Sequence, residues 1–328
     1  MSDISNPPEV IDPHGVLDTD SRKMVERLVR DPFLDPAFTV PQMREAFEAF
    51  YSAMYAARAR TADSRDVTIT GRHGPVPLRI YHPRGAAVGT LPVFVFIHGG
   101  GSIMGSLESY DAVCQELCSG SGCMVVSVDY RLAPEHPYAQ AVDDCYDAAV
   151  WAHANAEALG GDPDRLAVGG ESGGGGLAAS LAQMARDEGG PPIRFQLLMY
   201  PFVGSRAPSG SMAEFGKGYV FDAEDLEMFI DLNFPDREHL KDWRVSPIWA
   251  ENLENLPPTF MLTASADILR DDAEDYARRL ADAGVQVELS RYDGTIHGFV
   301  VMAGEVEAGR RALAECGRRL RDALAGPA

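Results

Sequence analysis

The sequence lacks the segments that direct a chain into or across a membrane. Its first eight residues contain neither a basic region nor an apolar one, and no apolar run reaches the length of about 18 residues that a spanning helix needs. The five cysteines include no C-x-x-C pair, so neither a disulfide framework nor a thiolate zinc site is expected. HExxH, His/Cys and EF-hand patterns are also missing, so we expect no metal and no cofactor. These absences predict a soluble, reduced, cytoplasmic protein.

The chain also has too few basic residues to favour an anionic partner. It carries 29 Lys and Arg against 49 Asp and Glu, a formal net charge of −20 at pH 7. Such a charge repels phosphate backbones and anionic lipid headgroups, so nucleic acids and membrane surfaces are not expected partners. With 328 residues, 45% of them apolar, the chain can bury a large core, and we expect one domain with a cap.

Apolar strands alternate with helices from residue 92 onward, after a helical start that ends near residue 62. This alternation is typical of a mostly parallel sheet that helices cover on both faces. A hairpin around 67–69 and 78–81 precedes it. The further expected strands are 93–97, 124–128, 166–168, 195–199, 259–262 and 285–289, and the expected helices are 19–30, 41–57, 108–119, 139–158, 174–187, 222–232, 271–283 and 304–324.

Residues 202–250 interrupt this alternation with Gly- and Ser-rich turns and aromatic clusters. An insertion of this length on a compact sheet favours a lid or a pocket wall. We therefore divide the chain into an N-terminal cap segment (1–62), a catalytic core (63–201 and 251–328) and a cap insertion (202–250). The last strand, near 285–290, would lie exposed at the sheet edge and would suit pairing in a homodimer.

A serine stands between glycines where an apolar strand turns into a helix. Residues 170–174 read Gly-Glu-Ser-Gly-Gly, after Leu-Ala-Val and before small helix-forming residues. In this setting G-x-S-x-G is typical of a nucleophile elbow, where the backbone is strained and flanking side chains would collide with neighbouring chain. Ser172 is therefore the candidate nucleophile, although the five residues alone are weak support in a chain with 32 glycines.

The other parts of a hydrolase follow in the order serine, acid, histidine. Residues 98–101 read His-Gly-Gly-Gly directly after the strand 93–97, where backbone N–H groups can approach a substrate oxygen without obstruction. Asp267 directly follows the segment 259–266 and is the candidate acid, whereas Asp271 and Asp272 suit the first turn of the next helix. His297 lies in a polar loop after the strand 285–289 and is the candidate base.

These residues resemble the hormone-sensitive-lipase-like (bacterial family IV) carboxylesterases. The resemblance extends from the strand near Val67 to beyond His297, and its order and spacing make it specific. It implies the α/β-hydrolase fold, with a mostly parallel eight-stranded sheet flanked by helices and a helical cap. The matching segments are His98–Gly101, Asp129–Glu135, the Ser172 elbow, Tyr200-Pro201, Ser246-Pro247, Asp267 and His297–Phe299.

The resemblance also implies a mechanism. Ser172, Asp267 and His297 correspond to the family's nucleophile, acid and base. The oxyanion donors correspond to the backbone N–H groups of Gly100, Gly101 and Gly173. The implied function is a serine carboxylesterase that hydrolyses short- to medium-chain acyl esters of small molecules through an acyl-enzyme intermediate.

Three residues depart from the family pattern. Gly173 stands where alanine is commoner, Gly176 where asparagine is usual, and Ser102 where a bulky aromatic residue commonly follows the three glycines. A small Ser102 would leave more room or more polarity near the substrate.

Two nearby charged groups favour structural roles. Arg131 and Glu135 are expected to form an ion pair that shapes the pocket floor, and Glu171 is expected to be a hydrogen-bonding residue rather than a second acid.

Three other functions remain open. Gly173-x-Gly175-x-x-Ala178 formally matches a dinucleotide-binding pattern, but the apolar strand 195–199 lacks the acidic residue that the pattern needs. A catalytically silent binding protein on the same fold is the second alternative, although all three candidate positions are occupied. Hydrolysis of amides by the same residues is the third.

Overall fold

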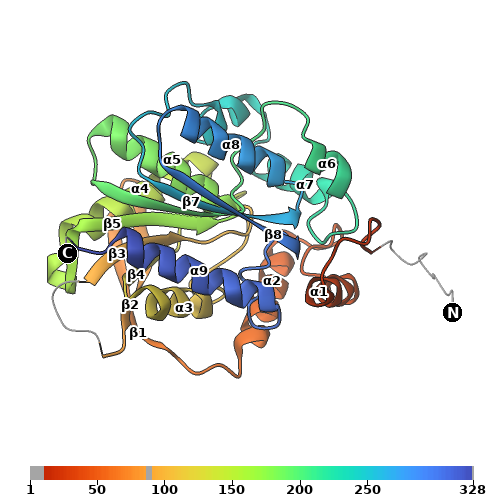
Figure 1. Ribbon diagram of the computed structural model, residues 1–328, viewed down its shortest axis with the longest axis horizontal. Coiled ribbons are helices and arrows are strands. Elements are labelled where there is room, and N and C mark those ends of the chain that lie inside the picture. The colour runs from red at the N-terminus through yellow and green to blue at the C-terminus, as the bar shows by residue number, and fades with distance from the viewer. Residues whose placement is uncertain (1–10, 86–90, 327–328) are drawn as a thin grey trace.

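The computed structural model describes residues 11–85 and 91–326, which form a single eight-stranded sheet in the order β1-β2-β4-β3-β5-β6-β7-β8 (Figure 1). The strands are β1 (Ala62–Gly71), β2 (Gly74–Pro83), β3 (Leu91–Ile97), β4 (Met124–Val128), β5 (Gly161–Glu171), β6 (Ile193–Met199), β7 (Thr259–Ala266) and β8 (Val287–Ile296). The helices are α1 (Thr19–Arg30), α2 (Val40–Tyr55), α3 (Asp111–Ser121), α4 (Tyr138–Asn155), α5 (Gly173–Glu188), α6 (Gly210–Phe215), α7 (Ala223–Asn233), α8 (Arg270–Asp282) and α9 (Glu307–Ala323).

The sheet is antiparallel only at its first edge. β1 and β2 form the predicted hairpin, and β2 pairs antiparallel with β4, whereas β3 to β8 pair in parallel. The carboxyl ends of the parallel strands therefore lie along one edge of the sheet. The predicted α/β-hydrolase fold, with a mostly parallel eight-stranded sheet, is confirmed.

Strand β3 shows why the strand sequences are apolar throughout. Successive side chains of a strand point to opposite faces, and here Phe94 and Phe96 join one core cluster while Val95 and Ile97 join the other. Helices α3 and α9 cover the first face, and α4, α5 and α8 cover the second (Figure 1). Both faces are buried, so alternation of apolar and polar residues is not needed.

Helices from the two predicted cap segments gather at the carboxyl end of the parallel strands. Figure 1 shows α1, α2, α6 and α7 together at this end of the sheet. Within the predicted segment 1–62, residues 1–10 lie outside the described residues, as do 86–90 and 327–328 of the predicted core. No helix in the described ranges is both long and apolar enough to cross a bilayer.

Two element predictions need correction. Residues 292–296 were expected to be a loop, but β8 continues through Ile296, because an edge strand can keep polar side chains on its solvent face while its backbone pairs with β7. The short helix α6 was not predicted, since its six residues are too few to show a periodic apolar pattern. As the last strand, β8 lies at the sheet edge with Leu289 exposed, and the homodimer through this strand stays a prediction.

The predicted ion pair between Arg131 and Glu135 is also wrong. The guanidinium of Arg131 binds the carboxylate of Asp144, while Glu135 binds Arg44 on α2. Asp144 also accepts a hydrogen bond from the backbone N–H of Arg131 at 3.0 Å, and its side chain is 1% exposed. Asp144 therefore ties the segment after β4 to helix α4.

We expect Asp144→Ala to lower the free energy of unfolding by about 3–5 kcal/mol, because it leaves the charge of Arg131 largely buried and unpaired. Asp143 is the matched control, since its ion pair with Arg72 is more exposed to solvent. Asp143→Ala should cost about 1 kcal/mol or less. Urea unfolding measures both values, and equal losses in the two variants would contradict this account.

Candidate active site

Ser172 occupies the turn between β5 and α5. Its backbone has φ 53° and ψ −122°, a conformation that residues with a side chain rarely adopt. The neighbouring strand end holds this turn, because the Ser172 N–H donates to the Met199 carbonyl (3.0 Å) and the Ser172 carbonyl accepts from the Phe202 N–H (2.9 Å). The strained turn places Ser172 at the carboxyl edge of the sheet.

Two glycines allow this turn to pack against the end of β3. A Cβ atom on Gly170 would lie 2.3 Å from the Ile97 carbonyl oxygen. One on Gly174 would lie 2.2 Å from that same oxygen and 2.3 Å from the carbonyl oxygen of His98. The predicted collision of flanking side chains with neighbouring chain is confirmed, and the obstacle is backbone.

His297 connects Ser172 and Asp267 through its two ring nitrogens. Nε2 lies 2.8 Å from Ser172 Oγ, and Nδ1 lies 2.8 Å from Asp267 Oδ2. A carboxylate only accepts hydrogen bonds, so Nδ1 carries the proton and Nε2 can accept one from the serine. Asp267 is itself fixed, because its Oδ1 accepts from the Leu269 backbone N–H at 2.8 Å. The structure thus brings the predicted nucleophile, acid and base together.

Opposing effects act on the His297 imidazole. Burial disfavours its charged form and lowers its pKa, but the charge of Asp267, the hydrogen bond to Asp267 and the charge of Glu171 together outweigh burial. The net result is a pKa raised above the usual histidine value. The site therefore favours a proton on this ring more than water does.

The glycine loop after β3 lies against the start of α5. Gly100 and Gly101 both have positive φ (85° and 62°), and a Cβ on Gly173 would lie 3.4 Å from the Cα of Gly101. Within the described ranges, the N–H groups of Gly100, Gly101 and Gly173 make no backbone hydrogen bond. Three unengaged donors beside a helix N-terminus form a favourable environment for a negatively charged oxygen.

His98, the first residue of this loop, is held in place by ring stacking and hydrogen bonds. His98 is fully buried and stacks on the ring of Tyr130, with 4.3 Å between ring centroids. Its Nδ1 lies 2.9 Å from the Gly99 carbonyl oxygen, and the Tyr130 hydroxyl donates to the His98 carbonyl at 2.8 Å. Burial lowers the pKa of His98 to about 4, so the ring stays uncharged at neutral pH.

Glu171 is buried beside the loop and is held by a hydrogen bond. Its carboxylate accepts from the Tyr110 hydroxyl, and a Cβ on Gly99 would lie 1.8 Å from its Oε1. Burial raises the pKa of this carboxyl, although the hydrogen bonds that it accepts act in the opposite direction. Glu171 is thus a hydrogen-bonding residue behind the loop, as predicted.

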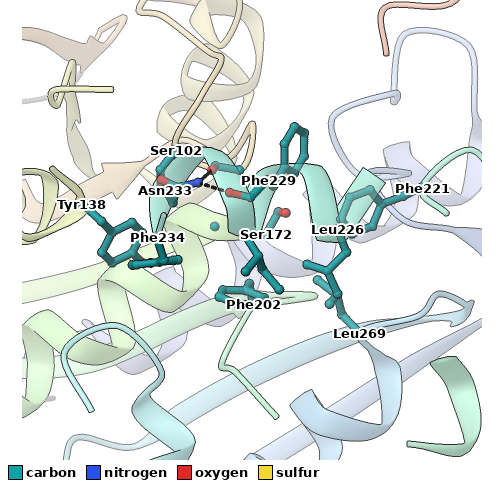
Figure 2. A pocket seen from close by; sticks show the side chains of 13 residues that line it. Ser102, Tyr138, Ser172, Phe202, Phe221, Leu226, Phe229, Asn233, Phe234 and Leu269 are labelled. Atoms are coloured by element: carbon teal, nitrogen blue, oxygen red, sulfur yellow. Dashed lines mark hydrogen bonds between the residues drawn. The ribbon is translucent and has the colours of Figure 1, made fainter. Parts of the chain in front are cut away.

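Two cavities meet at Ser172, and both are lined mainly by apolar side chains. The α7 cavity contains about 410 Å³ of empty space, and Figure 2 shows its walls around Ser172. The α2 cavity contains about 480 Å³ and includes His297 in its lining. The α7 cavity is lined by Gly101, Ser102, Tyr138, Ser172, Gly173, Phe202, Phe221, Leu226, Phe229, Ile230, Asn233, Phe234 and Leu269. The α2 cavity is lined by Phe33, Leu34, Phe47, Tyr51, Gly100, Gly101, Met104, Tyr110, Glu171, Ser172, Val220, Phe221, Phe229, His297, Gly298, Val301 and Met302.

Sequence reasoning missed the residues of α7 that touch the glycine loop. The ring of Phe229 fills the space where a Cβ of Gly101 would be, and Asn233 Nδ2 donates to the Gly101 carbonyl at 2.9 Å. The aromatic clusters of the insertion signalled a pocket wall but not these contacts. In the described part of the chain, no three His, Cys, Asp or Glu side chains are grouped as a metal site would require.

A mostly parallel sheet with a serine at a strained strand-to-helix turn is characteristic of an α/β hydrolase. Comparison with known proteins supports this class. Residues 94–301 match the family described by the alpha/beta hydrolase fold. Two similar relatives are from Mycobacterium tuberculosis. The carboxylic ester hydrolase LipN is 43% identical over 73% of this chain and 64% of its own length, and the carboxylesterase NlhH is 42% identical over 75% and 79%.

A solved esterase structure is also similar to this chain, and the similarity covers more of its length. The hyperthermophilic esterase from the archaeon Pyrobaculum calidifontis superposes with a TM-score of 0.90 at 39% identity, covering 94% of this chain and all of that one. The chain belongs to the alpha/beta hydrolase family. The predicted resemblance to its esterases is confirmed.

The surroundings of Gly173 and Gly174 differ, so alanine at these two positions should change the stability of the fold in opposite directions. Neither glycine has a positive φ, and a Cβ on Gly173 would meet only ordinary contacts of 3.4 Å or more. We expect Gly173→Ala to stabilise the fold by about 0.4–1 kcal/mol, since it restricts the unfolded chain. Gly174→Ala should destabilise it by about 1–3 kcal/mol, because the Cβ collides with the backbone of β3. Thermal unfolding tests this, and shifts of the same sign would contradict it.

Proposed function

We propose that this protein is a serine carboxylesterase that hydrolyses short- to medium-chain acyl esters. The observation that carries the proposal is the continuous set of hydrogen bonds from Asp267 through His297 to Ser172, where the two cavities meet. Ser172 is the nucleophile, His297 the general base and Asp267 the acid that holds the imidazole. The names of the esterases that this chain resembles support the same reaction.

The first half of the reaction forms an acyl-enzyme. His297 Nε2 takes the proton of the Ser172 hydroxyl as Oγ attacks the ester carbonyl carbon, and the carbonyl π electrons move onto oxygen. The N–H groups of Gly100, Gly101 and Gly173 stabilise this oxyanion. When the tetrahedral intermediate collapses, the bond to the alcohol oxygen breaks and His297 gives its proton to the departing alcohol.

The second half releases the acid. Water attacks the acyl carbon while His297 Nε2 accepts a proton from it, and collapse of the second intermediate returns that proton to Ser172 Oγ. The negatively charged Asp267 stabilises the imidazolium in both halves. No cofactor or metal enters either step.

The position of His297 indicates which cavity would receive the alcohol part of the ester and which the acyl part. The leaving alcohol must lie within reach of the proton on His297, and His297 lines the α2 cavity but not the α7 cavity. The alcohol therefore occupies the α2 cavity and the acyl group the α7 cavity. The walls of the α7 cavity are mainly apolar side chains, which suits the alkyl chain of an acyl group.

The proposal predicts that p-nitrophenyl esters from acetate to octanoate are substrates and laurate is a poor one. Ser172→Ala should lower kcat by about 10⁴-fold or more, because it removes the attacking oxygen. An organophosphonate probe should label the wild type and not this variant. Equal inertness of the two proteins toward both reagents would instead favour a binding protein on this fold.

The raised pKa of His297 predicts the pH profile. The base must be neutral to accept the serine proton, so kcat/KM should fall on the acid side with an apparent pKa above the usual value of about 6.5. Glu171→Gln should move this acid limb to lower pH, because one of the charges that favour the imidazolium is gone. A wild-type limb at or below about 6.5 would disagree with this geometry.

A further inference from the structure

The glycine loop after β3 contains a tight turn in which a serine adopts an unfavourable conformation. The Gly100 carbonyl accepts from the Ile103 N–H at 3.0 Å. The two residues between them, Gly101 and Ser102, have φ of 62° and 58°. Positive φ at both central positions is the pattern of a type I′ turn, which glycine adopts freely and a residue with a side chain adopts at a cost. Ser102 is therefore the strained residue of this turn.

A closely related turn would relieve this strain. Types I′ and II′ share a positive φ at the first central residue, but in type II′ the second central residue has a negative φ. The two types differ by a rotation of the peptide group between the central residues, while the flanking chain stays in place. In this protein that peptide group consists of the Gly101 carbonyl and the Ser102 N–H. Its rotation would give Ser102 an ordinary φ and would exchange the positions of the carbonyl and the N–H.

The nitrogen of this peptide borders the proposed oxyanion site, which the N–H groups of Gly100, Gly101 and Gly173 form. A Cβ on Gly173 would lie 3.5 Å from the Ser102 nitrogen, and the Ser102 N–H makes no backbone hydrogen bond in the described ranges. The N–H and the carbonyl of a trans peptide point in opposite directions, so the carbonyl now points away from Gly173. After rotation its partly negative oxygen would lie toward Gly173 and would disfavour an oxyanion there.

Asn233, the last residue of α7, holds this carbonyl in its present direction. Its Nδ2 donates to the Gly101 carbonyl at 2.9 Å and to the Phe229 carbonyl at 2.8 Å, as the dashed lines in Figure 2 show. The second bond lies within α7 and orients the amide toward the loop. No other hydrogen bond to the Gly101 carbonyl is present among the described residues. The direction of the strained peptide thus depends on one side chain of the cap insertion.

We propose that Asn233 is a positioning residue for the oxyanion site, because it keeps the N–H of the Gly101–Ser102 peptide, and not its carbonyl, toward the reacting oxygen. The inference rests on the proposed function, in which an oxyanion forms at this place. Asn233 acts through the glycine loop and does not touch the reacting atoms. Its contribution therefore arises in the transition state, where the substrate oxygen becomes negative.

The first test removes the donor and keeps a side chain of similar size. In Asn233→Leu the Gly101 carbonyl loses its partner, and kcat for p-nitrophenyl butyrate should fall about tenfold, the effect of losing one hydrogen bond. KM should stay close to that of the wild type, because the uncharged ester binds before the oxyanion forms. Steady-state kinetics measure both constants.

Asn155→Leu is the matched control. Asn155 is the last residue of α4, as Asn233 is of α7, and its Nδ2 donates to the carbonyl four residues earlier, that of Trp151, at 2.9 Å. It therefore makes the same bond within its helix but lines neither cavity. Its kcat should equal that of the wild type. Thermal unfolding of both variants shows whether each is folded at the assay temperature.

A second substitution distinguishes a rotation of the peptide from a general loosening of the site. In Ser102→Gly the residue has no preference against positive φ, so the rotated turn gains no advantage. The loss of kcat caused by Asn233→Leu should then be several-fold smaller in the Ser102→Gly protein than in the protein with Ser102. A purely structural role of Asn233 predicts equal losses in both.

A trifluoromethyl ketone measures the oxyanion site directly. Ser172 Oγ bonds to its carbonyl carbon, the carbonyl π electrons move onto oxygen, and His297 takes the serine proton. The inhibition constant should rise in Asn233→Leu by the same factor as kcat/KM for the ester falls.

The possible results separate this inference from the proposed function. An unchanged kcat in Asn233→Leu, or equal losses with and without Ser102→Gly, would overturn the inference and leave the esterase mechanism intact. A loss that appears only as a raised KM, with unchanged inhibition by the ketone, would overturn it too. Failure of the wild type to hydrolyse any ester would reject the proposed function itself.

Discussion

The arrangement of the site depends on the close packing of the Ser172 turn against the end of β3. Parallel pairing sets Ile97 beside Gly170, and the missing side chains of Gly170 and Gly174 let the two backbones touch. The serine turn and the glycine loop follow these two strands directly. Their relative position is therefore fixed by backbone contact, which is stiffer than any contact between flexible side chains.

The features that the sequence predicts best are those whose causes lie within a short stretch of chain. The Ser172 turn and the 98–101 loop each combine an apolar strand with glycines, and each needs no distant partner to be recognised. Strand alternation then implies that the ends of parallel strands share one edge, which brings Asp267 and His297 to the same place. Most of the fold and the central part of the site follow from these two facts.

The features that the sequence did not predict depend on partners far away along the chain. Arg131 and Glu135 were paired because they are close in sequence, but α4 and α2 supply the actual partners, Asp144 and Arg44. Charge alone does not select among the chain's many carboxylates. Tyr138 likewise belongs to no motif, and only the folded chain shows that it faces the same cavity as Ser102.

Helix α7 supports the glycine loop directly. The Phe229 ring would lie 2.5 Å from a Cβ on Gly101, and Asn233 donates to the Gly101 carbonyl, so α7 contacts this residue through both packing and a hydrogen bond. Moving α7 away would remove both of these contacts from the glycine loop. The α2 cavity adjoins a larger hollow beside α1. The two share the lining residues Phe33, Leu34 and Val220. Phe229 of α7 also lines the α2 cavity, so this one helix contributes to the walls of both cavities that meet at Ser172 and to the packing of the glycine loop.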